Sequence, residues 1–166
     1  MRGCHAQTGQ WCQSKIVEAL NHPIYDIITD MRPDSSSFRL TAVYNLDPKK
    51  QNKLFVPKGF LHAFVVPPYE GEDDAIFMYY CDNVYHKDAE ICVNPMSLLP
   101  KIVDILPDEY CKQYDLPYLK QLFRDNDLVL SEKDTAGMDY SEWAQKIAIE
   151  YEADKILWYT DIKCAK

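Results

Sequence analysis

Apolar and polar residues alternate along much of the first half of the chain, which is the period-two pattern of half-buried β-strands. The clearest run covers residues 38–46, in which every second residue is apolar. Shorter apolar runs predict further strands over residues 14–20, 24–31 and 75–81, separated by turn-forming residues. This density of short strands predicts a mainly β fold, a single antiparallel barrel or sandwich.

A second feature of the pattern is the stretch from Leu54 to Val66, where apolar residues approach His62 from both sides. Pro57 and Gly59 interrupt the run just before the histidine, so we expect a strand, a tight bend and a second strand that delivers His62 to the interior. There the imidazole is either a core side chain bonded to a backbone carbonyl or part of a pocket. The residues of this stretch leave both interpretations open.

In the last third of the chain the apolar residues fall at helical spacing, and prolines separate the segments. We therefore expect short helices that pack on the barrel. Either Asp139 or Ser141 is suited to cap a last helix. This helix would carry Trp143, Ile147 and Tyr151 on one stripe.

The length and composition are those of a folded globular protein. The chain has 166 residues, of which 47% are hydrophobic and 13% aromatic, enough for one domain with a substantial core. We expect a single domain over residues 1–166. The barrel should cover about residues 1–92 and a helical C-terminal part about residues 96–166.

Charge and cysteine content narrow the function classes. Twenty-six acidic and 18 basic residues give a formal net charge of -8, which argues against a nucleic-acid-binding or anionic-membrane surface. The six cysteines show no paired CxxC spacing, so we expect free thiols in a reducing compartment. The sequence has neither an apolar run of the roughly 20 residues that a membrane span needs nor the apolar core of a signal peptide. We expect a soluble, cytoplasmic protein.

Several motifs occur in a fixed order along the chain. Arginine-glycine-x-histidine lies at residues 2–5, and Lys15 follows ten residues after the histidine. Proline-x-glycine-phenylalanine-x-histidine-x-phenylalanine lies at residues 57–64, an aromatic strand segment at residues 77–79, and serine-x-lysine-aspartate at residues 131–134. Together they resemble the dTDP-4-dehydrorhamnose 3,5-epimerase family, which are sugar-nucleotide epimerases of the cupin fold.

The resemblance implies both an architecture and an activity. The fold would be a cupin-type antiparallel β-barrel, or jelly roll, followed by short C-terminal helices. The protein would be an isomerase that inverts C3, C5 or both of a nucleoside-diphosphate 4-keto-6-deoxyhexose by proton transfer. It would work without a cofactor and as a homodimer, in the biosynthesis of dTDP-rhamnose.

The resemblance also assigns catalytic roles. His5 is the base that removes a proton beside the ketone, and Asp134 holds its imidazole in the required tautomer. Lys15 matches a lysine beside the keto oxygen, and Tyr79 matches the tyrosine that acts as general acid on the opposite face. Neighbouring residues of a strand point to opposite sides, so only one of Tyr79 and Tyr80 can face the pocket, and the register favours Tyr79.

Four further residues match binding positions of the family. Arg2 matches the arginine that meets the diphosphate, a role that suits its planar, permanently charged guanidinium. His62 matches a second pocket histidine that helps to bind the sugar. Tyr85 and Glu90 align with positions on the nucleotide side.

The chain departs from the family pattern in two places. It begins at the arginine-glycine-x-histidine motif, whereas family members carry further residues that supply exchanged strands and part of the nucleotide site. The usual tryptophan-aspartate-aspartate-proline segment is missing, and residues 91–129 match poorly, so the resemblance covers about residues 2–90 and 128–137. A shortened enzyme, a misplaced start codon and a member without catalysis are all compatible with these differences.

Two other classes of function remain open. In a metal-dependent cupin enzyme His5 and His62 would share an ion, but the histidine-x-histidine pair of such sites is missing, and we expect no bound metal. A non-catalytic sugar-nucleotide-binding cupin would keep the pocket without turnover. The paired base and acid, His5 and Tyr79, favour an enzyme, with a mono-epimerase or ketoisomerase of the same fold as related activities. The exact sugar and nucleobase are left open.

Overall fold

A computed structural model of the chain describes residues 1–68, 74–99, 107–113, 116–125, 128–155 and 157–159. Within these residues the strands form two antiparallel sheets, one of five strands in the order β4-β3-β6-β1-β8 and one of three in the order β5-β2-β7. The strands are β1 (Arg2–Gln7), β2 (Lys15–Ala19), β3 (Ile24–Asp30), β4 (Thr41–Leu46), β5 (Lys53–Val56), β6 (Phe60–Val65), β7 (Phe77–Cys81) and β8 (Glu90–Cys92).

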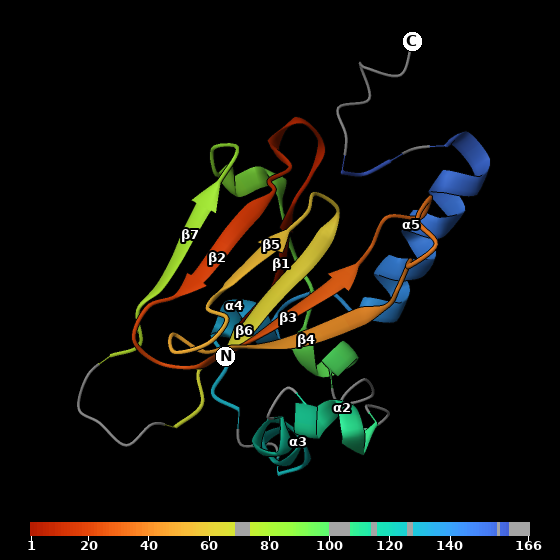
Figure 1. Cartoon of the computed structure of the whole chain (residues 1–166). Helices are drawn as coiled ribbons and strands as arrows, with labels where there is room; N and C mark the ends of the chain where they lie inside the picture. The colour runs from red at the N-terminus through yellow and green to blue at the C-terminus, as the bar shows by residue number, and fades with distance from the viewer. Residues whose placement is uncertain (69–73, 100–106, 114–115, 126–127, 156, 160–166) are drawn as a thin grey trace.

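The two sheets pack against each other through their inner faces (Figure 1). Every second residue of a strand faces the opposite sheet, because side chains alternate across a strand. Six buried apolar residues form the core between the sheets: Val17, Ala19, Ile24, Ile28, Leu46 and Val56. This arrangement confirms the predicted mainly β fold of the cupin type.

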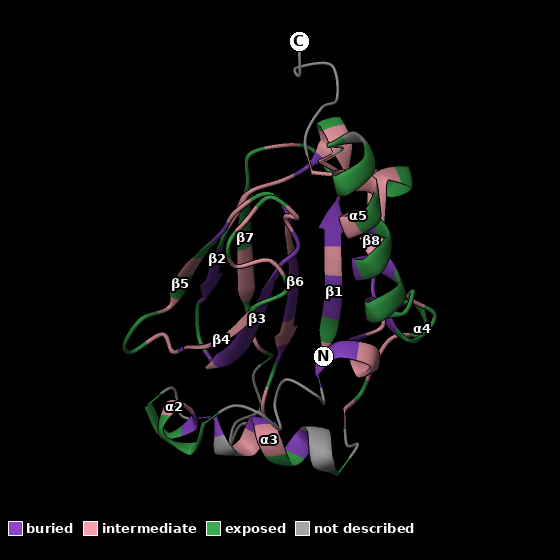
Figure 2. Ribbon diagram, turned by 90° about the vertical axis from the view of Figure 1, so that its right-hand side faces the viewer, coloured by how far each residue is buried: buried purple, intermediate pink, exposed green. Residues whose placement is uncertain are grey.

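Helices cover the outer face of the five-stranded sheet. Ile27, which points to the opposite side of β3 from Ile28, packs in one cluster with Trp143 and Ile147 of the last helix. Strand β3 is therefore buried along its whole length, and Figure 2 shows that most of β1 is buried as well. The helices include α2 (Asp108–Gln113), α3 (Pro117–Arg124), α4 (Glu132–Thr135) and α5 (Tyr140–Asp154), residues 95–99 are also helical, and 3-10 turns cover Gly9–Trp11 and Lys87–Ala89.

The predicted helix cap and bend are both present. Asp139 is the N-cap of α5, and its side chain accepts hydrogen bonds from the backbone N–H groups of Ser141 and Glu142. Between β5 and β6 the chain turns at Gly59, whose φ of +84° is in the region that favours glycine. The bend delivers His62 to the interior, where 6% of the residue is exposed.

The strand predicted over residues 38–46 is too long, since β4 begins at Thr41. Arg39 has a φ of +70°, and Leu40 is 65% exposed. The cause is a polar network around the buried carboxylate of Asp30, to which Ser37 donates a hydrogen bond of 2.6 Å. This network holds the preceding loop in turns, so the apolar alternation there does not extend the strand. The other predicted strands agree with the structure to within two residues.

Candidate active site

The inner face of the five-stranded sheet carries the two predicted histidines side by side. His5 of β1 and His62 of β6 are cross-strand partners, so their side chains project from the same face. Gly3 permits this close approach. It has a φ of +105°, and a Cβ at this position would lie 2.5 Å from the carbonyl oxygen of His62.

A cavity of about 240 Å³ opens between the sheets beside these histidines. Lys15 of β2 and Tyr79 of β7 reach into it from the three-stranded sheet, opposite His5. The lining consists of Arg2, Gly3, His5, Lys15, His62, Phe64, Tyr79 and Glu90. The structure thus brings together six of the eight predicted site residues, and the other two, Asp134 and Tyr85, contact lining residues from outside the cavity.

The His5 imidazole lies between two carboxylates. Its Nε2 is 2.8 Å from Oδ1 of Asp134, and its Nδ1 is 3.5 Å from Oε1 of Glu90, which lines the cavity. Burial lowers the pKa of His5, and the two carboxylates offset this effect only in part. The ring is therefore neutral at neutral pH, which is the form that can accept a proton.

A short helix positions the Asp134 carboxylate. Ser131 is the N-cap of α4, and its hydroxyl accepts a hydrogen bond from the backbone N–H of Asp134. The same hydroxyl donates to Oδ2 of Asp134 at 2.7 Å. Asp134 is fully buried, so Ser131 fixes the side chain whose other oxygen faces His5. The serine-x-x-aspartate spacing, which is typical of a helix cap, is the feature of the sequence that indicates this role of Ser131.

His62 has a carboxylate partner of its own. Its Nε2 lies 2.7 Å from Oδ2 of Asp26 on the adjacent strand β3, and both residues are buried. The interpretation of His62 as a core residue bonded to a backbone carbonyl is therefore wrong. Asp26 therefore supports a residue of the cavity although it was not among the predicted site residues, because its contact with His62 depends on the register between β3 and β6.

Lys15 and Tyr79 form the wall opposite the histidines. Burial lowers the pKa of Lys15 and raises that of Tyr79, although 38% of Tyr79 remains exposed. The Lys15 ammonium lies 5.9 Å from the centre of the Tyr79 ring, and this ring meets His62 edge-on. Tyr80 points away from the cavity toward Glu18, as the strand register predicts.

The mouth of the cavity carries a charged network. Arg2 is exposed there. The Glu90 carboxylate accepts a hydrogen bond of 2.9 Å from the Tyr85 hydroxyl and contacts the Lys133 ammonium. Although burial raises the pKa of Glu90, the hydrogen bonds from Lys133 and Tyr85 lower it on balance. Glu90 is therefore ionised beside His5.

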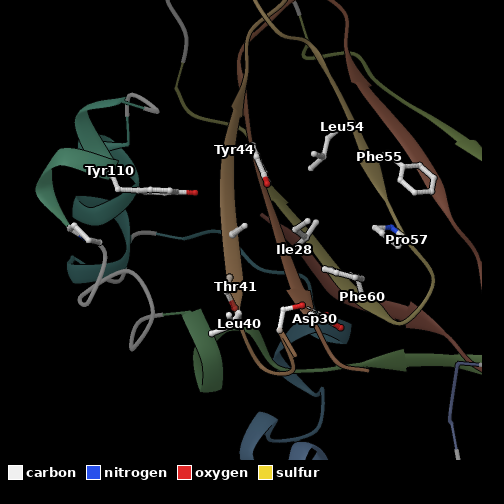
Figure 3. Close-up of a pocket in the computed structure, with 13 residues that line it drawn as sticks. Ile28, Asp30, Leu40, Thr41, Tyr44, Leu54, Phe55, Pro57, Phe60 and Tyr110 are labelled. Carbon is white, nitrogen blue, oxygen red and sulfur yellow. Dashed lines mark hydrogen bonds between the residues drawn. The ribbon is translucent and has the colours of Figure 1, made fainter. Parts of the chain in front are cut away.

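A larger cavity of about 520 Å³ lies farther along the same barrel (Figure 3). Ile28, Tyr44, Leu54 and Phe60 form much of its wall. Its carboxylate, Asp30, is already bound by Arg32 and by two serine hydroxyls. This cavity lacks a paired base and acid among its described lining residues.

The alternative in which His5 and His62 share a metal ion is not supported by the geometry, because each imidazole faces a different carboxylate. Among the described residues, the donor atoms that come within ion-binding distance of one another belong instead to His5, Cys92 and Asp134.

Comparison with known proteins points to one family. The family model of dTDP-4-dehydrorhamnose 3,5-epimerase matches residues 1–142. The dTDP-4-dehydrorhamnose 3,5-epimerase of Escherichia coli is 35% identical over 96 residues, which are 57% of this chain and 50% of that protein. The same enzyme of Shigella flexneri is 32% identical over 90 residues, 54% of this chain and 48% of that protein. The chain thus spans about half the length of these curated relatives.

Solved structures show the same fold. The dTDP-4-dehydrorhamnose 3,5-epimerase of Elizabethkingia anophelis has a TM-score of 0.62 at 28% identity, over 85% of this chain and 66% of that one. An epimerase of Legionella pneumophila in complex with dTDP-4-keto-L-rhamnose has a TM-score of 0.57 at 27% identity, over 82% and 61% of the two chains. No helix in the described part of this chain is long and apolar enough to cross a membrane. The matched family model, the shared fold and the motif positions show that the chain belongs to the dTDP-4-dehydrorhamnose 3,5-epimerase family.

Proposed function

We propose that the protein is an epimerase that inverts C3, C5 or both of a nucleoside-diphosphate 4-keto-6-deoxyhexose. One observation carries the proposal: His5 on one sheet faces Lys15 and Tyr79 on the other across a single cavity. Epimerisation beside a ketone needs a base on one face of the sugar ring and an acid on the other. A residue pair on opposing sheets meets this need.

In the proposed reaction His5 removes the proton. Asp134 faces Nε2 and favours the tautomer that carries its proton there, which leaves the Nδ1 lone pair free toward the cavity. When Nδ1 takes the proton from the carbon beside the ketone, the C–H electron pair moves toward the carbonyl oxygen and an enolate forms. Lys15 stabilises this oxygen, and its low hydration strengthens the interaction.

Tyr79 completes the inversion. Its phenol donates a proton to the opposite face of the same carbon, so the configuration changes while the ketone is restored. The raised pKa keeps the phenol protonated until it is needed. Proton exchange with water then returns His5 and Tyr79 to their starting states. This sequence uses no cofactor and no essential metal.

The proposed substrate is a sugar nucleotide, as the relatives suggest. The Legionella pneumophila structure contains dTDP-4-keto-L-rhamnose, and one from Bacillus anthracis at 29% identity and a TM-score of 0.58, over 82% of this chain and 65% of that one, contains TDP and pyrophosphate. Arg2 at the cavity mouth is suited to the diphosphate, and His62 to a sugar hydroxyl. Tyr85, whose ring is exposed next to Glu90, is suited to the nucleotide side.

We further propose a homodimer of single-domain subunits that works in the cytoplasm. The outer strands β4 and β7 leave sheet edges that a second copy can pair with or cover. Packing of α5 in one core cluster with the five-stranded sheet supports a single domain. The described cysteines are all free thiols, which fits a reducing compartment. Sedimentation at micromolar concentration tests the dimer, and a monomer would contradict it.

The reaction is tested in heavy water with a dTDP 4-keto-6-deoxyhexose. The wild-type protein should place deuterium at C3, C5 or both, as read by NMR. Tyr79→Phe should slow inversion at the carbon that Tyr79 protonates, whereas Tyr80→Phe, the matched control on the outer face of the sheet, should not. Deuterium at one carbon would identify a mono-epimerase. Binding by calorimetry without exchange at either carbon would replace the epimerase with a binding protein.

A further inference from the structure

His5 has a second neighbour that the proposed reaction does not use. On the side of β1 away from His62, the cross-strand partner of His5 is Cys92 of β8. Thiol and imidazole therefore project from the same face of the sheet. The Cys92 thiol also donates a hydrogen bond to the carbonyl oxygen of Lys133, the residue before Asp134. Strand register and the α4 turn thus bring three different metal-binding groups together.

The donor atoms of this cluster are close enough to share an ion. His5 Nε2, Cys92 Sγ and Asp134 Oδ1 all lie within 4.8 Å of one another. Donors bound to one tetrahedral zinc ion are roughly 3.3–3.6 Å apart, given zinc–ligand bond lengths of about 2.0–2.3 Å.

A second, independent observation concerns the buried carboxylate. Asp134 is fully buried, and its Oδ1 lies 2.8 Å from His5 Nε2. Apart from this contact with each other, neither atom has a hydrogen-bond partner among the described residues, so the pair can take up a further interaction. Neither Cys92 nor Asp134 lines the substrate cavity, and His5 and Cys92 are partly exposed.

We propose that His5, Cys92 and Asp134 form a regulatory binding site for a zinc ion behind the catalytic base. Thiolate, imidazole and carboxylate are the ligand types that zinc takes in proteins, and water completes the tetrahedron. Binding releases the thiol proton of Cys92 to solvent, because the thiolate is the ligand. The site requires no metal for turnover, so it is distinct from the metal centre of a metal-dependent cupin.

The ion inhibits by changing the tautomer of the base, a consequence that rests on the proposed function. Once Nε2 of His5 donates its lone pair to zinc, the remaining ring proton of the neutral imidazole sits on Nδ1. This nitrogen faces the cavity and can no longer accept a proton from the sugar. The ion lies outside the cavity, so zinc should lower kcat and leave KM nearly unchanged.

The test compares the wild-type protein with Cys92→Ser and with Cys81→Ser, a matched control at an exposed cysteine outside the cluster. Cobalt(II) alone should give a thiolate-to-metal charge-transfer band and tetrahedral visible bands in the wild type and in Cys81→Ser. The charge-transfer band should be lost in Cys92→Ser. Calorimetry with zinc chloride should show one ion bound. Cys92→Ser should weaken binding by more than about 100-fold, beyond the loss that an outer-shell partner causes.

The binding and inhibition measurements separate two kinds of failure. Added zinc should reduce the kcat of the wild type and of Cys81→Ser, chelator should restore it, and Cys92→Ser should keep full turnover with zinc present. An unchanged band or affinity in Cys92→Ser, or their loss in Cys81→Ser, would overturn the site even if the protein is an active epimerase. If the protein has no epimerase activity, the cobalt band and calorimetry still decide whether the site exists.

Discussion

The polar cavity around His5 and the apolar cavity beside Phe60 lie along one row of cross-strand partners, yet their walls have opposite chemistry. Across the inner face of the five-stranded sheet this row runs from β4 to β8 as Ala42, Ile28, His62, His5 and Cys92. Ala42 and Ile28 line the apolar cavity, and the two histidines line the polar one.

The change from apolar to polar occurs between two neighbouring strands, β3 and β6. On the apolar side the sheet is stabilised by packing, which needs only shape and volume. On the polar side each histidine needs a carboxylate, which comes from β3 for His62 and from α4 for His5. The row shows that the sheet provides positions, whereas the carboxylates that reach the two histidines, one from β3 and one from α4, determine what those positions can do.

The largest effect should follow from changing the polar end of the row. His5→Asn removes the base and should lower kcat by about 10²- to 10⁴-fold, the usual range for a general base. Ile28→Val, its control two strands away in the same row, should keep turnover within twofold, roughly the scatter of such measurements. Circular dichroism should show both variants folded. A folded His5→Asn with near-normal kcat would contradict the assignment of the base.

A slightly smaller loss is expected at the opposite wall. Lys15→Ala leaves the enolate oxygen without its cation and should lower kcat by about 10²- to 10³-fold, as for loss of an oxyanion donor. Lys53→Ala is a suitable control, since Lys53 lies on the adjacent strand and pairs with Glu18 outside the cavity. Solvent deuterium incorporation should disappear in Lys15→Ala alone. Equal exchange in the two variants would show that Lys15 does not stabilise the enolate.

A substitution at the apolar end of the row should lower the stability of the protein and leave its turnover unchanged. Ile28→Ala leaves a cavity in the core between the sheets and should reduce the free energy of unfolding by about 2–5 kcal/mol. Turnover per folded molecule at 25 °C should remain unchanged. Denaturant titration measures the first quantity and active-site-normalised kinetics the second. A loss of kcat comparable to that of Lys15→Ala would mean that the two cavities are coupled.

The smallest effect concerns pH. Since burial lowers the pKa of His5, the acidic limb of kcat/KM should have its midpoint below about 6.5, the value of free imidazole. The rate rises with pH through this midpoint because the base must be neutral. Glu90→Gln removes a negative charge that favours the imidazolium, so the midpoint should fall further. A midpoint above that of free imidazole, or a rise in Glu90→Gln, would contradict this electrostatic account.

The sequence predicted most of the strands, most of the polar cavity and one supporting carboxylate, Asp134, but not the support of His62 by Asp26 or the place of Cys92. Buried β3 follows from its apolar run, and the motifs identified His5, Lys15 and Tyr79 as one set. Asp26 was missed because its partner is 36 residues away and is reached through strand register. Cys92 was counted only as a free thiol, since its place beside His5 also depends on register.

The apolar cavity and the loop before β4 could not be predicted for a related reason. The cavity forms where residues from β3, β4, β5 and β6 meet, and no single segment carries a sign of it. The alternation that starts at Phe38 was misleading, because Ser37 and its neighbours bind the Asp30 carboxylate and hold the chain in turns. Local periodicity describes a strand only where no buried polar group competes for the backbone.

Gly3 changes what the arginine-glycine-x-histidine motif can be taken to mean. The glycine is required because a methyl group there would collide with the backbone of β6, whatever reaction the cavity performs. A descendant that had lost catalysis but kept the barrel would still need it. The glycine of the motif therefore indicates an inherited fold and not an activity. To recognise active enzymes among such sequences, Lys15, Tyr79 and Asp134 should be checked together with His5.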